Sequence, residues 1–517
     1  MSRQHNIQRA ITELFDVVVI GGGITGAGIA VTAARKGWKT LIIDKHDFAF
    51  GTSSRSAKMI HGGLRYLQNL QIKLVKEALH EREHLLKEYP HLVKPQPFFM
   101  PIYKSRLSKI KLGIGLSGYD YLTGESSMPK HAEIDLEEVK QRFPQLKTDA
   151  MVGGFVYYDA KTNDARLTNE VIQEACDLGA IALNYFELTT LQKGNNKIKS
   201  ISCEDKISGK SFTIKSKVFI AATGIWTDEI LRKFDSNDTK KYMMPSKGVH
   251  LIVSSNHFPK DCVMLLPTAN GDGRMIWCMP WDDNLNVIGT TDTDYNEGND
   301  EIFILENEVK YILDSVNAQL KEKKLTEDDI LSVYAGIRPL LNDNDENKKS
   351  NQRSRDYQIW WNNDNMLTIS GGKLTSFLSM AENCIKTIEE KHAIQSNDND
   401  EIIINTLIDN FKHRYGVKNA TLIANIAQEE LELTQQFVGY EYSPAEIIFF
   451  IRYQNGQKLD DILTRRTLIS YQMKDFDEDL VKTVSEIMAK ELNWSAEQIA
   501  IEINLYRHSW KLMHSWK

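Results

Sequence analysis

A short apolar strand that runs into a spaced set of glycines constrains the fold more than any other feature of the sequence. Residues Val17–Ile20 form the predicted strand, and glycines in the GxGxxG spacing then open a helix of small residues. Gly21 permits a tight turn, Gly23 lets a pyrophosphate approach the backbone, and Gly26 lets the helix pack closely on the strand. A second apolar strand ends at Asp44, where a carboxylate binds ribose hydroxyls. The sequence therefore predicts a Rossmann-like βαβ unit that holds a dinucleotide.

The glycine motif by itself does not separate FAD from NAD, because both cofactors carry the ADP half that this fold binds. Two later segments favour a flavin. Residues 221–224 close a strand in the manner of a second nucleotide-contacting turn, and residues 370–375 start a late helix with two glycines. The unpaired N–H groups and the positive dipole end of such a helix suit the flavin ring. We therefore expect FAD as the cofactor.

The chain divides into three predicted units, two of them interleaved. The βαβ pattern breaks into Pro-containing extended pieces, resumes, and gives way again to alternating segments between His250 and Ile288 that predict an antiparallel sheet. After a polar linker, amphipathic helices with almost no glycine follow. The predicted class is α/β. It comprises a Rossmann-like FAD-binding domain (1–93, 149–240 and 331–392) interleaved with an antiparallel-sheet substrate-binding domain (94–148 and 241–330), plus an all-helical C-terminal domain (400–517).

Charge and cysteine usage exclude several classes of protein. The net charge of -7 argues against nucleic-acid binding, which depends on clustered Lys and Arg. The 5 cysteines are scattered without CxxC or another metal-ligand spacing, so we expect no metal and a reducing compartment. The polar start leaves no room for a signal peptide, and no apolar run reaches the roughly 20 residues of a membrane-spanning helix. We expect a cytoplasmic protein whose membrane contact is peripheral.

The run Thr52–Leu67, which reads TSSRSAKMIHGGLRYL, resembles the signature of the FAD-dependent, quinone-linked glycerol-3-phosphate dehydrogenases. The resemblance implies oxidation of sn-glycerol 3-phosphate at C2 to dihydroxyacetone phosphate, with a hydride passing to FAD and the electrons to membrane quinone. The helical tail matches the family only in general character. Further segments that resemble the family in order and spacing are Asp164–Leu167, Lys247–His250, Ile288–Asp292, Ala335–Leu340, Ser354–Tyr357 and Gly371–Thr375.

The matching motifs supply candidates for binding the phosphate. A phosphate dianion needs fixed cations, and Arg65, Arg355 and Lys373 carry guanidinium or ammonium donors that are expected to converge on it. Tyr66 adds a hydroxyl donor. We expect these four residues to bind the substrate.

Loss of a hydride from C2 requires a base for the hydroxyl proton and a cation for the developing alkoxide. His250 and Arg338 are the catalytic candidates, and the sequence does not decide which of them takes the proton. The candidate cofactor-binding residues are Gly21, Gly23, Gly26, Asp44, Ser53, Ser54, Gly224, Gly372, Lys373, Leu374 and Thr375.

Other interpretations stay open. A glycerol-3-phosphate oxidase that uses oxygen shares these motifs, and a related flavin oxidase of amino acids or hydroxy acids shares the glycine turn but needs carboxylate recognition. A non-catalytic FAD scaffold and an RNA-modifying flavoprotein fit the acidic charge less well. The quinone-linked form must reach the inner face of the cell membrane, and Lys104–Leu116 and Tyr506–Lys517 interleave basic with apolar side chains in the way that surface binding needs. A homodimer also stays open.

Overall fold

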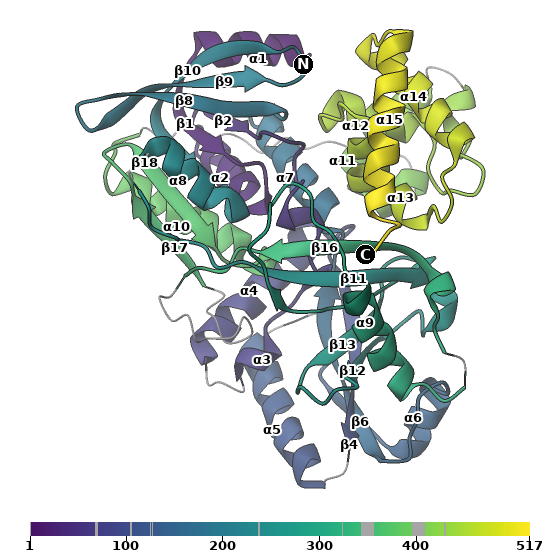
Figure 1. Cartoon of the computed structure of the whole chain (residues 1–517). Coiled ribbons are helices and arrows are strands. Elements are labelled where there is room, and N and C mark those ends of the chain that lie inside the picture. Colours follow the sequence, from purple (N-terminus) through teal and green to yellow (C-terminus); the bar gives the residue numbers. More distant parts are fainter. Residues whose placement is uncertain are drawn as a thin grey trace.

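The computed structural model describes residues 2–67, 71–103, 106–124, 126, 128–235, 238–322, 324–342, 356–394, 409–428 and 431–516. Within these residues the strands form an eight-stranded and a ten-stranded sheet. A separate group of helices at the C-terminal end, yellow and yellow-green in Figure 1, lies beside the first sheet. The expected α/β class, with an all-helical C-terminal unit, is confirmed.

The first sheet contains the predicted βαβ unit. Its strand order is β17-β18-β10-β1-β2-β7, and β1, β2, β7, β10 and β18 run parallel, as expected of a dinucleotide-binding fold. In the register, Ile20 at the end of β1 lies opposite Ala221 and Ile43, so the carboxyl ends of the central strands share one edge. The strands are β1 (Leu14–Ile20), β2 (Thr40–Ile43), β7 (Ile181–Leu183), β8 (Phe186–Gly194), β9 (Lys197–Asp205), β10 (Lys210–Ala221), β17 (Tyr357–Trp361) and β18 (Met366–Gly371).

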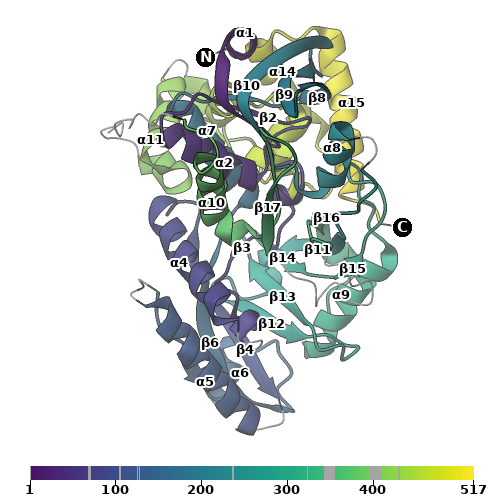
Figure 2. The same ribbon diagram turned by 90° about the vertical axis from the view of Figure 1, so that its left-hand side faces the viewer.

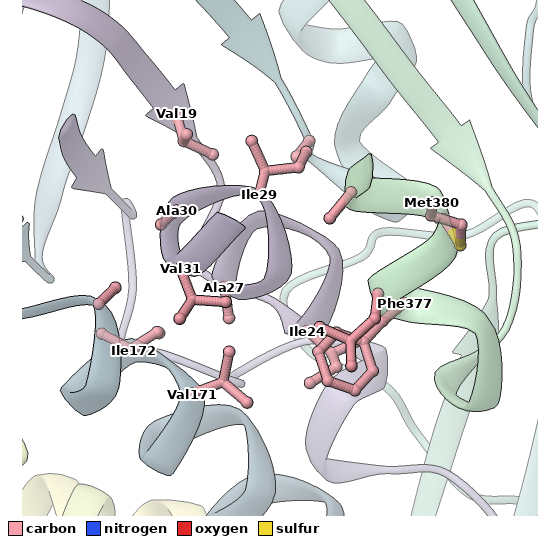
Figure 3. Packing of buried hydrophobic residues seen from close by; sticks show 14 of the residues in the cluster. Val19, Ile24, Ala27, Ile29, Ala30, Val31, Val171, Ile172, Phe377 and Met380 are labelled. Atoms are coloured by element: carbon pink, nitrogen blue, oxygen red, sulfur yellow. The ribbon is translucent and has the colours of Figure 1, made fainter. Parts of the chain in front are cut away.

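Helix α2 (Ile24–Arg35) follows the glycine turn and is buried on several sides, which explains its small, uncharged residues. It lies between α7 (Asp164–Asp177) and α10 (Phe377–Glu389), whose Val171, Ile172 and Phe377 point toward it in Figure 3. A Cβ at Gly28 would come within 2.8 Å of the Phe377 ring, so this glycine allows α10 to approach. Close packing on both sides fixes the helix N-terminus at the edge of the sheet.

The second sheet has the order β15-β11-β14-β13-β12-β4-β6-β3, with β16 paired to β11 and β5 to β6. Figure 2 shows it below the first sheet. The predicted antiparallel segments between residues 250 and 288 lie here. The strands are β3 (Met59–Ile60), β4 (Lys94–Tyr103), β5 (Ala132–Ile134), β6 (Met151–Lys161), β11 (Ser246–Ser254), β12 (Val263–Pro267), β13 (Met275–Pro280), β14 (Leu285–Gly289), β15 (Thr293–Asp294) and β16 (Ile330–Arg338).

Three strands lie in a different sheet from the one that the predicted domains imply. β3, β6 and β16 fall in segments predicted for the cofactor-binding domain, yet β3 pairs with β6, β6 with β4 and β16 with β11, all in the second sheet. A buried strand has the same apolar pattern in either sheet, so its partner is not readable from its own residues. The predicted domain boundaries stay a prediction, and these three strands pair across them.

The remaining helices cover the sheets and build the C-terminal unit, which has its own hydrophobic core. Every helix within the described ranges is too short or too polar to cross a bilayer. Around the sheets lie α1 (Arg3–Thr12), α3 (Leu64–Leu67), α4 (Ile72–Glu88), α5 (Arg106–Thr123), α6 (Leu136–Arg142), α8 (Thr227–Phe234) and α9 (Glu306–Gln319). The C-terminal unit contains α11 (Asp409–Ala427), α12 (Pro444–Tyr453), the π-helical turn η8 (Asp461–Arg466), α13 (Ile469–Gln472), α14 (Glu478–Leu492) and α15 (Ala496–Leu512).

Candidate active site

A cavity of about 260 Å³ lies at the carboxyl edge of the first sheet. The ends of β1, β2, β10 and β18, the first turn of α2 and the end of β16 line it, so both sheets contribute to its wall. This is the edge at which α/β proteins bind dinucleotides. The lining residues that were predicted from the sequence are Gly21, Gly23, Asp44, Ser53, Gly224, Arg338, Gly372, Lys373 and Leu374.

The three glycines of the GxGxxG motif have different surroundings. Gly21 has φ +113, and a Cβ there would lie 2.4 Å from the carbonyl oxygen of Ala222. A Cβ at Gly26 would lie 1.9 Å from the carbonyl oxygen of Gly21, so Gly26 serves helix packing and does not line the cavity. Gly23 caps α2 and lines the cavity together with Ile24. The first turn of a helix presents N–H groups that suit a pyrophosphate.

Asp44 and Ser53 hold the glycine turn from two sides. Asp44 accepts hydrogen bonds from the backbone N–H of Gly22 at 2.6 Å and of His46 at 2.8 Å. Burial raises the pKa of Asp44, although these two N–H donors act in the opposite direction. Ser53 Oγ accepts a hydrogen bond from Ile24 N at 2.9 Å, at the start of α2. The predicted ribose-binding carboxylate therefore also fixes the turn that faces the pyrophosphate.

The remaining predicted cofactor residues divide into two groups. Gly224 and Gly372 line the cavity with positive φ, and a Cβ at Gly224 would meet no atom within 4 Å. This open, backbone-lined wall, together with the helix N-terminus and Asp44, fits a bound FAD. Ser54 and Thr375 do not line the cavity: the Ser54 hydroxyl donates to Gly51 O at 3.4 Å, and Thr375 exchanges hydrogen bonds with the backbone of His61.

Arg338 stands at the end of β16, where the two sheets meet. Its Nη1 lies 3.1 Å from Asp292 Oδ1 and donates to Ser246 Oγ at 3.2 Å, while Nη2 donates to Thr291 O at 3.1 Å. The Asp292 ion pair holds the guanidinium in one orientation at the cavity wall. Asp292 lies in a segment that resembles the family, but its own sequence context indicates no role for it.

His250 lies in β11 directly opposite Tyr334 of β16, and their rings stack with centroids 4.6 Å apart. The side chain is buried, and neither ring nitrogen has a hydrogen-bond partner among the residues that the structure describes. Burial, followed by the positive charges of Arg338 and Lys58, holds the pKa of His250 well below its ordinary value. The imidazole is therefore neutral at neutral pH and able to accept a proton. It does not itself line the cavity.

Two glycines in β11 and β16 allow the loop that contains Arg55 to pack closely on the second sheet. Gly248 and Gly336 lie opposite each other in the β11–β16 pair, between His250 and Arg338 along the strands. A Cβ at Gly248 would come within 2.4 Å of Arg338 Nη2, and one at Gly336 within 2.1 Å of the carbonyl oxygen of Arg55. The paired glycines thus make room for the arginine head and for the loop that carries the family-like signature.

The predicted phosphate-binding residues are only partly described. Lys373 lines the cavity, and its Nζ lies 3.8 Å from the centroid of the Tyr66 ring, a cation–π contact. Arg355 and the side chain of Arg65 lie outside the described residues. The structure therefore brings Lys373 and Tyr66 together and places Lys373 in the same cavity as Arg338.

A buried ion pair behind His250 was not predicted. Lys58 Nζ donates to Asp164 Oδ1 at 2.8 Å, and both side chains are almost fully buried. The same ammonium lies 4.7 Å from the Trp281 ring and 4.8 Å from the Tyr334 ring. Both charged residues lie in segments that carry the family resemblance, but nothing in those segments shows that they pair across more than 100 residues.

The parallel sheet, its cavity and the adjoining antiparallel sheet define an FAD-dependent oxidoreductase. The family model described as "FAD dependent oxidoreductase" matches residues 16–371, and the model described as "C-terminal domain of alpha-glycerophosphate oxidase" matches residues 366–499. FAD is the cofactor of this family, and the cavity fits it.

Similar proteins of known name identify the branch of FAD-dependent oxidoreductases to which the chain belongs. The mitochondrial glycerol-3-phosphate dehydrogenase of Bos taurus is 32% identical and covers 96% of this chain and 73% of its own length. The aerobic glycerol-3-phosphate dehydrogenase of Bacillus subtilis (strain 168) is 34% identical over 76% of this chain and 70% of its own length. The chain belongs to the FAD-dependent glycerol-3-phosphate dehydrogenase family. The glycerol-3-phosphate dehydrogenase of Bacillus halodurans, solved with FAD, has the same fold, with a TM-score of 0.75 at 24% identity over 99% of this chain and 98% of its own.

Proposed function

We propose that the protein oxidises sn-glycerol 3-phosphate at C2 to dihydroxyacetone phosphate and passes the electrons to membrane quinone. The observation that carries this proposal is that Arg338 and Lys373, two of the cationic residues that line the cavity, come from segments that resemble the family. A substrate with a phosphate and a C2 oxygen offers a negative partner to each cation. The names of the relatives favour the same substrate.

In this proposal each residue of the site has a separate role in hydride transfer, proton transfer or phosphate binding. Bound FAD supplies the acceptor for the hydride that leaves C2. Arg338, which lines the cavity, stabilises the negative charge that develops on the C2 oxygen. The neutral imidazole of His250 is the proposed acceptor of the C2 hydroxyl proton, and because it lies behind the cavity wall, this role requires the wall to open toward the ring when substrate binds. Lys373 and Tyr66, with Arg65 and Arg355 by family resemblance, bind the phosphate.

A glycerol-3-phosphate oxidase is the second candidate, since the C-terminal helices match a family model described from an alpha-glycerophosphate oxidase. Substrate oxidation is identical in the two candidates, and only the acceptor differs. Turnover with a quinone analogue in the absence of oxygen supports the dehydrogenase. Stoichiometric peroxide formation in air, without turnover by the quinone analogue, supports the oxidase.

For the quinone-linked form we propose peripheral binding to the inner face of the cell membrane through α5. Leu107, Ile110, Ile114 and Tyr121 are exposed on this helix at a spacing that gives one stripe. The opposite face of α5 packs against the second sheet through residues such as Leu116. An exposed apolar stripe of this kind suits the acyl boundary of a bilayer.

The C-terminal run 506–517 suits a membrane surface less well. Trp510 donates a hydrogen bond to Met473 O at 3.2 Å, and Trp516 donates to Glu327 at 3.3 Å. Arg507 is paired with Glu478. These side chains already have partners within the protein, so α5 is the proposed contact.

The test of the proposed reaction is anaerobic mixing of the FAD-loaded protein with glycerol 3-phosphate, without NAD. We expect loss of the yellow flavin absorbance, and a far smaller loss with glycerol at the same concentration, because glycerol lacks the phosphate that Lys373 would bind. A 2-hydroxy acid is the control for carboxylate oxidases. Equal bleaching by glycerol or by the hydroxy acid contradicts the assigned substrate.

A further inference from the structure

A cluster of buried charges joins the C-terminal helical unit to the loop that follows β2. Asp47 in this loop is 0% exposed, and Arg465 and Arg466 in η8 are 4% and 0% exposed. Arg466 binds Asp47 with both of its terminal nitrogens, at 2.6 and 2.9 Å, and Arg465 Nε donates to the same carboxylate at 2.6 Å. One carboxylate of the cofactor-binding unit thus receives two guanidinium groups from the helical unit.

The arginines are fixed from the helical side as well. Arg465 donates to Asp461 at 2.8 Å and to Asp460 at 2.5 Å, and Arg466 donates to Gln454 O at 2.8 Å. Each guanidinium therefore has partners in its own unit and in the neighbouring loop. Such forked, charge-assisted hydrogen bonds fix direction as well as distance.

Asp47 belongs to the loop that builds one wall of the cavity. Asp44, Lys45 and Phe50 of the same loop line the cavity, and Arg465 also lies over the Phe50 ring at 5.7 Å from its centroid. Asn184, next to β7, donates to Asp47 at 2.9 Å. A displacement of Asp47 would therefore move residues that line the cavity.

The cluster is sensitive to the loss of any member, because a charge left unpaired in the interior keeps its full desolvation cost. Burial by itself would raise the pKa of Asp47, but Arg466 and Arg465 lower it to about 2. A carboxyl whose pKa is lowered in the folded protein loses this stabilisation only as the pH falls through the folded value. The contact is therefore intact at neutral pH.

We propose that the C-terminal helical unit braces the FAD cavity, and that Arg465 and Arg466 are the positioning residues that hold the cavity loop through Asp47. The inference concerns cofactor retention and does not depend on which substrate or electron acceptor the protein uses.

The experiment compares Arg466→Met, Arg466→Lys and a control, Arg414→Met, in the FAD-loaded full-length protein. Arg414 pairs with buried Glu446 inside the helical unit and makes no contact with Asp47 that the structure describes. The control therefore weakens the same unit without touching the brace. The measurements are the rate of flavin release, followed by the rise in flavin fluorescence on dilution, the FAD dissociation constant, and thermal unfolding.

We expect Arg466→Met to release flavin at least about tenfold faster than wild type. Arg466→Lys should be intermediate, because an ammonium keeps the charge but not the fork, and Arg414→Met should retain wild-type release even if its unfolding temperature falls. The proposal is overturned if Arg466→Met and Arg466→Lys retain wild-type release, or if Arg414→Met accelerates release equally. If Arg466→Met fails to fold, the flavin release rates of Arg466→Lys and Arg414→Met are compared instead. Faster release by Arg466→Lys alone supports the proposal, and equal release by the two variants overturns it.

Discussion

The imidazole of His250 is oriented by ring packing, with no hydrogen bond to it among the described residues. Tyr334 supports one face of the ring, and the Tyr334 hydroxyl donates to Ser56 O at 2.8 Å. Lys58 lies 4.8 Å from the Tyr334 ring and is tied to Asp164. The orientation of the candidate base thus depends on an aromatic ring and a buried ion pair.

Removing the base or its neighbouring cation should slow hydride transfer more than it weakens binding. We expect His250→Gln and Arg338→Met to reduce flavin about a hundredfold more slowly or worse, which is the usual cost of losing a general base. The measurement is anaerobic stopped-flow reduction by glycerol 3-phosphate over a range of concentrations. Arg65→Ala is the comparison, since we expect it chiefly to raise the substrate concentration at which the reduction rate is half-maximal. Unchanged reduction rates in both variants would remove His250 and Arg338 from the mechanism.

The same environment sets the pH dependence of reduction. Burial, then Arg338 and Lys58, lower the pKa of His250, so the neutral form persists below the ordinary histidine pKa of about 6.5. The reduction rate should stay level as the pH falls through 6.5 and decline only below it, and His250→Gln should remove that decline. The pH profile of the stopped-flow rate checks this, and a half-maximal rate at or above about pH 7 would be inconsistent with it.

At the scale of helices and strands, the elements formed by neighbouring residues were predictable from the sequence, whereas the pairing of distant strands was not. The strand before Gly21, the glycine turn and Asp44 lie within 30 residues, and their pattern is specific. The placement of β6 and β16, by contrast, depends on β4 and β11, which are distant in sequence. The pairing of Arg338 with Asp292 was not predictable for the same reason: the two residues are distant in sequence, and a charged residue alone does not indicate its partner.

Helix α5 carries the prediction about the membrane. Leu107, Ile110 and Ile114 are 61%, 60% and 69% exposed, and burying such a side chain contributes about 1.5–3 kcal/mol. Replacing all three by Ser should lower binding to anionic vesicles more than tenfold in co-sedimentation, and replacing Lys111 by Gln should weaken it mainly at low salt. Lys109, also predicted as a contact, is already paired with Glu133. Lys104 and the side chain of Arg106, also predicted as contacts, lie outside the described residues.

The control for this experiment is Val438→Ser, which removes an apolar side chain that is 95% exposed in the C-terminal unit. It should bind vesicles like the wild type. If the triple Ser variant does so too, α5 is not the anchor. If the wild type itself does not bind, a protein that reacts with oxygen in solution becomes the better account.

At the scale of the whole molecule, three units meet at one place. The first sheet provides most of the dinucleotide cavity, the second sheet adds Arg338 from its β11–β16 pair, and the helical unit reaches the cavity loop through Arg465 and Arg466 of η8. The sequence predicted the kinds of unit but gave the helical one no role. The contact between the helical unit and the cavity loop joins Asp47 to two arginines more than 400 residues away, a distance over which the sequence shows no pairing.

The distribution of the cavity wall along the chain has a consequence for biosynthesis. Strand β1 ends at Ile20, but its neighbour β10 ends at Ala221 and the glycine turn of β18 lies at Gly371. A ribosome adds about 5–20 residues per second, so β1 can meet β2 within seconds but waits on the order of tens of seconds for β10. FAD can therefore be captured only late, after most of the polypeptide has emerged. Until β10 pairs with it, the apolar strand Val17–Ile20 keeps one edge open to other nascent chains, so misassembly during synthesis is a risk for this chain.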